Sequence, residues 1–323
     1  MRAIYVSRFG GPDVLTVADR PDPSPAAGEV VVRLHAAGVN PVDAYIRTGQ
    51  YARLPELPYT PGADGAGVID QVGDAVTQFK AGDRVYVAAF LVRNGTYAEK
   101  IVCPAHMAHP LPEPVSFAQG AALGVPAATA YRALVLRAGA RAGETLLVHG
   151  ASGAVGVAAT QLAHSFGLRV LGTAGSEAGL EVARQAGAQE VFNHREEGYA
   201  ARITAATGGR GVDLILEMLA NANLDRDLTL LAPKGRVVVI GNRGRIEIDP
   251  RLTMGKELAI LGTTLWSTTA DEYRQIHAGL GGALASGVLR PAIGRELPLE
   301  KAPEAHRAVL EDRAAGKIVL TMA

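Results

Sequence analysis

The sequence predicts an α/β protein of two domains, in which a doubly wound parallel sheet interrupts a β-rich domain. Short strand-like runs fill the first third of the chain, strands alternate with helical patterns from about Phe117, and a strand-like run over residues 317–321 ends it. Such alternation is typical of a parallel sheet with helices on both faces. The 323 residues also exceed one ordinary hydrophobic core. We therefore assign residues 1–123 and 266–323 to the β-rich domain and 124–265 to the inserted domain.

In the first third of the chain we expect short strands and little room for regular helices. The strand-like runs are bounded by turn residues such as Gly10-Gly11-Pro12 and Asn94-Gly95. Cys103 lies in an alternating run and is expected to be buried in a strand. The other expected strands are residues 3–6, 29–36, 67–72 and 84–88.

The pattern changes near Phe117, where residues 118–136 have helical spacing, and six apolar strand-like runs follow. The expected strands are residues 145–149, 169–173, 190–192, 212–217, 236–240 and 258–262. The expected helices are residues 153–166, 177–185 and 199–207, with a further helix over 271–286.

Composition excludes several classes of function. The 32 basic and 32 acidic residues give no net charge, which argues against nucleic acid or a membrane surface as the main partner. One cysteine excludes an internal disulfide and any multi-thiolate metal site. The N-terminus does not resemble a signal peptide, and no apolar run is long enough to span a bilayer. We expect a cytoplasmic protein.

A glycine-rich turn follows the first strand of the inserted domain. His149-Gly-Ala-Ser-Gly153-Ala-Val-Gly156 lies between a buried strand and a helix, which is the context that a dinucleotide fingerprint requires. Gly153 lets the backbone approach a pyrophosphate, and Gly156 lets the helix pack closely. The N–H groups at the start of the helix favour the anion.

The end of the second strand indicates which nicotinamide cofactor is bound. NAD-binding folds usually carry an acidic residue there, which bonds the ribose 2′-hydroxyl. This strand ends in Leu171-Gly-Thr-Ala-Gly175-Ser176, with no carboxylate to repel a 2′-phosphate. Glu177 comes just beyond, so NADH stays open, but the pattern favours NADPH.

Several longer stretches resemble zeta-crystallin-type quinone oxidoreductases, the zinc-free branch of the medium-chain dehydrogenase/reductases. The resemblance runs from end to end. It implies a Rossmann NADPH-binding domain within a GroES-like catalytic domain, one-electron or hydride reduction of quinones, and a homo-oligomer, a dimer or a tetramer. The stretches that carry it are Asn40-Pro-Val-Asp-Ala-Tyr45, Tyr59-Thr-Pro-Gly62, His149-Gly-Ala-Ser-Gly153, Glu190-Val-Phe-Asn-His-Arg-Glu196, Glu217-Met-Leu-Ala-Asn221 and Gly244-Arg-Ile-Glu-Ile-Asp-Pro-Arg251.

By position, the resemblance places Tyr45 beside the nicotinamide and other residues along the rest of the cofactor. These are Ser152, Gly153, Ala154, Val155 and Gly156 at the pyrophosphate, Gly175 and His194 at the adenosine phosphate, and Asn223, Ile240, Gly241, Asn242, Arg243, Thr263, Thr264 and Leu265 elsewhere. Structural alternatives remain for four of them. His194 could cap a strand, Asn223 could cap a helix starting at Leu224, Arg243 could be a solvated loop charge, and Tyr45 could be a structural aromatic.

The zinc ligands of the metal-dependent relatives are missing. Where those proteins need an early Cys and a Gly-His-Glu, this chain has Gly38-Val-Asn40 and Gly62-Ala63-Asp64. We therefore expect no metal and no alcohol oxidation, which would depend on a Lewis acid. An acceptor that is already electron-poor mainly needs positioning and hydrogen bonds, for which Asn40 and Tyr45 are candidates, with Thr129 lining the same cleft.

Two other functions stay open. One is NADPH-dependent reduction of α,β-unsaturated carbonyls on the same scaffold, and the other is an RNA-binding or structural crystallin-like role. The loop over residues 87–96 is longer than is usual in the resembled family, which affects the substrate more than the cofactor.

Overall fold

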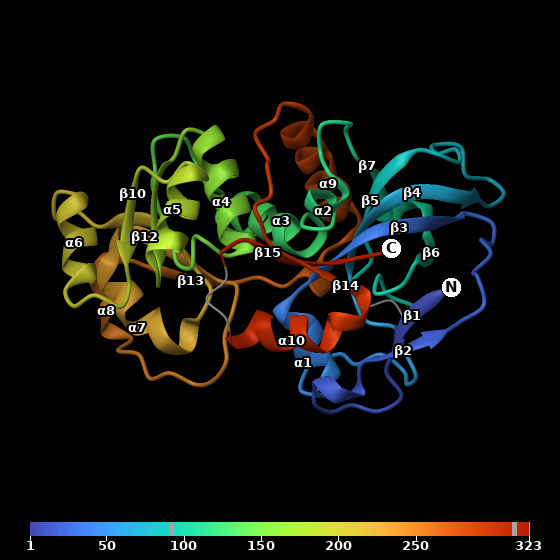
Figure 1. Ribbon diagram of the computed structural model, residues 1–323. Helices are drawn as coiled ribbons and strands as arrows, with labels where there is room; N and C mark the ends of the chain where they lie inside the picture. The colour runs from blue at the N-terminus through green and yellow to red at the C-terminus, as the bar shows by residue number, and fades with distance from the viewer. Residues whose placement is uncertain (91–93, 312–314, 323) are drawn as a thin grey trace. The chain divides into compact units, whose positions relative to one another are not determined.

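The computed structural model describes residues 1–90, 94–311 and 315–322 and forms two compact units (Figure 1). The first comprises Met1–Val125 and Pro291–Ala323, and the second comprises Pro126–Arg290. Residues 266–290, which the sequence prediction put in the first domain, thus group with the second. The reason is packing between helix α9 (Ala270–Ala285) and helix α3 (Gly124–Tyr131), because a Cβ on Gly279 would lie 2.3 Å from the Tyr131 ring.

The first unit is built on a seven-stranded sheet, and all four strands expected there form. Its order is β14 (Ile293–Pro298), β15 (Lys317–Thr321), β3 (Glu29–Val39), β4 (Asp64–Val72), β5 (Arg84–Ala88) and β7 (Ala108–Pro110), with β6 (Lys100–Pro104) pairing with β3. Strands β1 (Arg2–Tyr5) and β2 (Thr16–Asp19) form a separate antiparallel pair. Cys103 is buried in β6, as expected. Part of the loop expected to be long, residues 91–93, lies outside the described residues.

The expectation of little helix in the first third of the chain is wrong at helix α1 (Pro41–Arg47). This helix follows β3, and helix α10 (Ala302–Glu311) packs against it (Figure 1). The start of α1 has a local sequence signal, since Asn40 precedes a proline and the Asp43 carboxylate accepts the Asn40 N–H at 2.8 Å. A seven-residue helix is stable here because its apolar side is buried, with Ile46 packed among Leu299 and Ala302.

The second unit is a six-stranded, all-parallel sheet with the strand order of a Rossmann fold, and its six strands were all predicted. The order is β10 (Glu190–Asn193), β9 (Arg169–Ala174), β8 (Thr145–Val148), β11 (Val212–Glu217), β12 (Leu231–Val239) and β13 (Ala259–Gly262). The helices between strands are α4 (Ala154–Ser165), α5 (Glu177–Gln185), α6 (Tyr199–Ala206), α7 (Ala220–Leu230) and α8 (Arg251–Lys256). The short helix α2 (Phe117–Gly120) belongs to the first unit.

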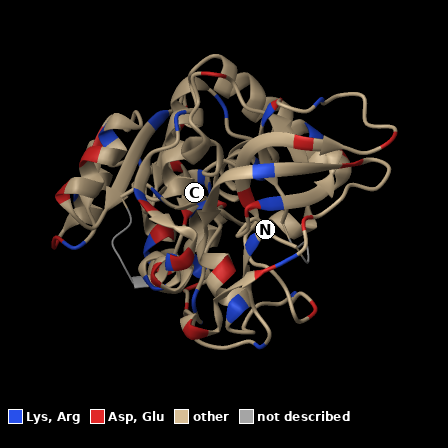
Figure 2. Cartoon of the chain, turned by 45° about the vertical axis from the view of Figure 1, so that its right-hand side comes forward, with Lys and Arg blue, Asp and Glu red and all other residues tan. Residues whose placement is uncertain are grey.

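Charged residues of both signs are interspersed along the chain, without a run of one sign (Figure 2). This distribution agrees with the zero net charge. Within the described part of the chain, every helix is too short or too polar to cross a bilayer.

Candidate functional site

In the second unit, the predicted cofactor residues lie at one edge of the sheet. Because all six strands are parallel, their carboxyl ends meet at that edge, and each predicted segment follows such an end. These are residues 150–156 after β8, Gly175 after β9, His194 after β10, Asn223 after β11, residues 240–243 after β12 and residues 263–265 after β13. The strand order reverses between β8 and β11, which is where open α/β sheets bind ligands.

The glycine turn has the geometry of an anion site. Gly150 has a φ of +61°, and Gly153 begins helix α4 without a capping side chain, so the first N–H groups of the helix stay available to a ligand. A Cβ on Gly156 would lie 2.3 Å from the Gly150 oxygen, which confirms that this position needs close packing. A Cβ on Gly153 would meet only the Gly150 oxygen, at 3.5 Å, so the space beside it is open. The turn therefore fits a dinucleotide pyrophosphate.

The end of β9 is flanked by cationic and imidazole side chains. A Cβ on Gly175 would lie 2.8 Å from His194 Nε2 and 3.0 Å from Arg195 Nε, so the structure brings these three residues together. Arg195 was missed in the sequence, because nothing local relates residue 195 to residue 175. The Glu177 carboxylate, which had kept NADH open, pairs instead with Arg184 at 3.1 Å. These groups suit a 2′-phosphate.

The segments after β11, β12 and β13 are bonded to one another or to the sheet. Asn223 Nδ2 donates to Glu217 Oε1 at 3.1 Å, and Arg243 N donates to Asn221 Oδ1 at 2.9 Å. The alternative that Asn223 caps a helix is wrong, since α7 begins at Ala220 and Asn223 lies within its first turn. The Thr263 hydroxyl accepts from Arg132 at 2.9 Å.

Beneath this edge, three ionisable side chains meet in the core. His149 Nε2 lies 2.9 Å from Asp227 Oδ1 and 3.6 Å from Glu217 Oε2, and all three residues are buried. Burial raises the pKa of Glu217 and of Asp227 to about 7 and lowers the pKa of His149. One nitrogen or oxygen atom from each of these three side chains lies within 4.8 Å of the other two. The spacing of the histidines in the sequence did not reveal that His149 has two carboxylate neighbours.

In the first unit, Asn40 belongs to a second buried cluster. Lys317 Nζ donates to Asp64 Oδ2 at 3.0 Å and to Asn40 Oδ1, while Asn40 Nδ2 donates to Asp64 Oδ2 at 2.9 Å. The other Asp64 oxygen accepts the Val125 N–H at 2.6 Å. A zinc ion does not fit here, because Asn40, Ala63 and Asp64 offer neither thiolate nor imidazole and an ammonium group already neutralises Asp64.

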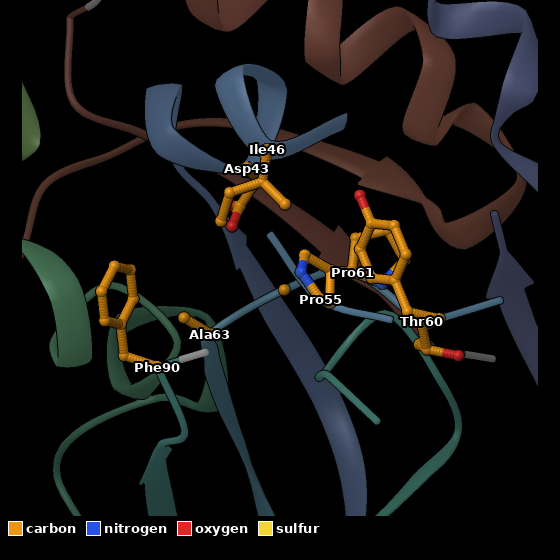
Figure 3. A pocket seen from close by; sticks show the side chains of 9 residues that line it. Asp43, Ile46, Pro55, Thr60, Pro61, Ala63 and Phe90 are labelled. Atoms are coloured by element: carbon orange, nitrogen blue, oxygen red, sulfur yellow. The ribbon is translucent and has the colours of Figure 1, made fainter. Parts of the chain in front are cut away.

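A small pocket of about 30 Å³ lies beside this cluster, with Asp43 in its wall (Figure 3). Asp43 Oδ2 accepts the Tyr97 hydroxyl at 3.1 Å, and that hydroxyl lies 3.2 Å from His306 Nε2. Burial is the main cause that raises the pKa of Asp43 to about 7. The Asp43 carboxyl group points into the pocket toward Phe90 and Ala63 (Figure 3). It is an acid that the sequence alone did not single out.

The other two predicted catalytic residues lie in different units. Tyr45 is half-buried on α1, two residues after Asp43, whereas Thr129 is half-buried on α3 of the second unit. Asn40, Asp43 and Tyr45 thus all belong to the segment at the start of α1, where Asn40 and Asp43 are bonded to each other. Thr129 is grouped with the residues of the nucleotide-binding unit.

Comparison with known proteins gives matches over the whole chain. Residues 26–113 match the alcohol dehydrogenase GroES-like domain, and residues 154–279 match the family described as zinc-binding dehydrogenase. Human quinone oxidoreductase is 51% identical, covering 100% of this chain and 98% of that protein. Escherichia coli quinone oxidoreductase complexed with NADPH has a TM-score of 0.88 at 32% identity, and an NAD-dependent alcohol dehydrogenase has a TM-score of 0.92 at 34% identity. In both comparisons the alignment covers 100% of this chain and 100% of the other chain.

Proposed function

Because this chain belongs to the quinone oxidoreductase family of the medium-chain dehydrogenase/reductases, we propose that its reaction is the reduction of quinones by NADPH. The protein is an oxidoreductase, and its cofactor is NADPH. The observation that carries the proposal is the full-length identity of 51% to human quinone oxidoreductase, together with a second unit whose strand ends fit a dinucleotide.

The residues at the sheet edge would hold the cofactor, which supplies reducing equivalents from its nicotinamide ring when bound. The N–H groups at the start of α4 and the Gly150–Gly153 backbone would bind the pyrophosphate. His194 and Arg195 would bind the 2′-phosphate, supported by their approach to Gly175. Asn223, with its amide fixed by Glu217, would contact the part of the cofactor nearer the nicotinamide.

For the acceptor, the cluster in the first unit changes the roles we expected. The Asn40 amide is only 3% exposed and bonded at both ends, so we propose that it positions α1 instead of bonding the quinone. Tyr45 remains the proposed hydrogen-bond donor to the acceptor or the nicotinamide. Asp43 is the proposed source of a proton for the reduced oxygen, because it lines a pocket and its pKa is near 7.

Steady-state kinetics test this function. With NADPH, we expect kcat/KM for ortho- or para-quinones to exceed kcat/KM for every member of a panel of α,β-unsaturated carbonyls. NADPH should bind at least about tenfold more tightly than NADH, about 1.4 kcal/mol, in a fluorescence titration. Enone values about tenfold above those of every quinone would overturn the assignment. Equal affinity for the two cofactors would remove the proposed 2′-phosphate contacts.

Replacing Tyr45 tests its proposed role separately. Tyr45→Phe keeps the aromatic ring and removes only the hydroxyl, so turnover should fall by about tenfold while the melting temperature stays within about 1 °C. Thermal unfolding and quinone turnover are measured on the same preparation. A lower melting temperature with normal turnover would identify Tyr45 as a structural aromatic.

We also propose a cytoplasmic homo-oligomer, a dimer or a tetramer, with a small-molecule acceptor and no nucleic acid partner. Two exposed apolar residues support self-association. Ile260 is 40% exposed on β13, which is an edge strand of the six-stranded sheet, and Met254 is 76% exposed on α8. An edge strand with apolar side chains readily pairs with another chain.

A further inference from the structure

A line of hydrogen-bonding groups crosses the second unit beneath the cofactor edge. It begins at the glycine turn, where Gly150 N donates to Thr173 Oγ1 at 3.3 Å. Thr173 Oγ1 lies 3.2 Å from His149 Nδ1, and His149 Nε2 lies 2.9 Å from Asp227 Oδ1. The line therefore joins the ends of β8 and β9 to helix α7.

At its other end the line reaches Glu217, which bonds two cofactor segments at once. Glu217 Oε1 accepts the Leu219 N–H and Asn223 Nδ2. The main-chain oxygen of Glu217 accepts the N–H groups of Ile240 at 2.9 Å and Gly241 at 3.2 Å. A change of the Glu217 side chain would thus act on the segment at residues 219–223, whereas the main-chain bonds to Ile240 and Gly241 would remain.

Two oxygens in this line lack partners unless a proton lies between them. Glu217 Oε2 and Asp227 Oδ2 are both buried and have no hydrogen-bond partner among the described residues. Both side chains are fully buried. If both were ionised, the loss of hydration and the repulsion between the two negative charges would destabilise the fold. The two carboxyl groups lie within hydrogen-bonding reach of each other, so one proton on Glu217, donated to Asp227, removes one charge and gives the pair a hydrogen bond.

We infer that Glu217 and Asp227 share one proton, and that this proton makes Glu217 a positioning residue for NADPH by holding the segment at residues 219–223 in its binding arrangement. The inference rests on the proposed NADPH-dependent function. Every donor then has one acceptor: Thr173 O–H donates to His149 Nδ1, His149 Nε2–H and Glu217 O–H donate to Asp227, and Glu217 Oε1 accepts.

The surrounding charges agree with this distribution of protons. Burial is the main cause that raises the pKa of both carboxyl groups to about 7, and the hydrogen bond between them raises the pKa of Glu217 further. Because His149 Nε2 lies 2.9 Å from Asp227 Oδ1 and can donate to it, Asp227 is the better-placed carboxylate and Glu217 the acid. Arg226 on α7 lowers the pKa of Asp227, and burial keeps the pKa of His149 low enough for a neutral ring. His194, the other titratable group close to His149, has a pKa below its ordinary value because of burial and is uncharged above pH 7.

The test compares Glu217→Gln with Glu217→Ala. A glutamine carries a carbonyl oxygen and a donor in the places of the protonated carboxyl group, so it mimics the shared-proton state at every pH. Alanine leaves Leu219, Asn223 and Asp227 without their partner. Glu181→Gln and Glu181→Ala, at a surface position on α5 that is bonded to Arg184, are the matched controls.

NADPH and NADH dissociation constants are measured from pH 7 to pH 9.5 by nicotinamide fluorescence, together with KM and kcat. In the wild type, affinity should fall as pH rises above about 7, because the proton of Glu217 leaves and the two carboxylates repel each other. Glu217→Gln should keep the affinity seen at pH 7 and lose this decline. Glu217→Ala should weaken NADPH binding by about tenfold or more and leave the quinone KM unchanged. The Glu181 variants should follow the wild type.

The inference is overturned if Glu217→Gln retains the pH dependence, or if folded Glu217→Ala binds NADPH as the wild type does. If Glu217→Ala does not fold, the pH profile of Glu217→Gln still decides. One bound metal ion per chain that is lost in Glu217→Gln would show that the three side chains hold a cation, which also overturns it. A wild-type protein that binds no NADPH would contradict the proposed function itself, a result distinct from all of these.

Discussion

Lys317→Met should destabilise the first unit by about 3–5 kcal/mol, since it removes one partner of a buried ion pair. The Lys317 side chain is 3% exposed and the Asp64 side chain is 0% exposed, so water cannot replace the lost ammonium group. The variant leaves the Asp64 carboxylate with a donor from Asn40 and one from the backbone, but no positive charge. Methionine keeps most of the side-chain volume, so lost packing contributes little.

Urea denaturation gives the free energy of unfolding, and two comparisons isolate the charge. Lys80→Met breaks the ion pair between Lys80 and Asp83, in which the Lys80 side chain is 84% exposed. It should lower the free energy of unfolding by less than about 1 kcal/mol. The double variant Lys317→Met/Asp64→Asn removes both charges of the pair, so much of the stability lost in the single variant should return. A Lys317→Met protein no less stable than Lys80→Met would show that the buried pair contributes no more than a surface one.

Gly156→Val should abolish most NADPH binding, by at least about a hundredfold, about 2.8 kcal/mol. The new Cβ would lie 2.3 Å from the Gly150 oxygen and 2.6 Å from the Ala151 Cα, and both are backbone atoms that cannot swing away. Helix α4 must therefore shift against the turn, and the N–H groups at its start leave the place of the pyrophosphate.

Two other glycines serve as controls in the same fluorescence titration. Gly153→Ala introduces only a contact of 3.5 Å, so it should leave the melting temperature unchanged and still weaken NADPH, because its Cβ fills space beside the turn. Gly255→Ala meets no atom within 4 Å on α8 and should leave NADPH affinity unchanged. Full NADPH affinity in Gly156→Val would mean that the turn does not bind the pyrophosphate.

The strands of the second unit were predictable because their signals are local. A buried parallel strand is a short apolar run, and a helix that follows it shows a period of 3.6 residues, so residues 212–217 and 177–185 were identified with the bounds that the structure has. The glycine turn was recognised for the same reason. Helix α1 was missed although Asn40 and Pro41 signal its start, because the surrounding strand pattern dominated the interpretation.

The sequence by itself determined the Rossmann unit, the β-rich unit and the segments that meet at the carboxyl edge, since each depends on residues within a few positions of one another. Only the tertiary structure decided the partners inside the two buried clusters. Lys317 meets Asn40 across 277 residues of sequence, and His149 meets Asp227 across 78. No local pattern encodes such contacts, because they form where separate strands end beside each other. The burial that shifts the pKa of Asp43 and Glu217 arises only when the rest of the chain surrounds them.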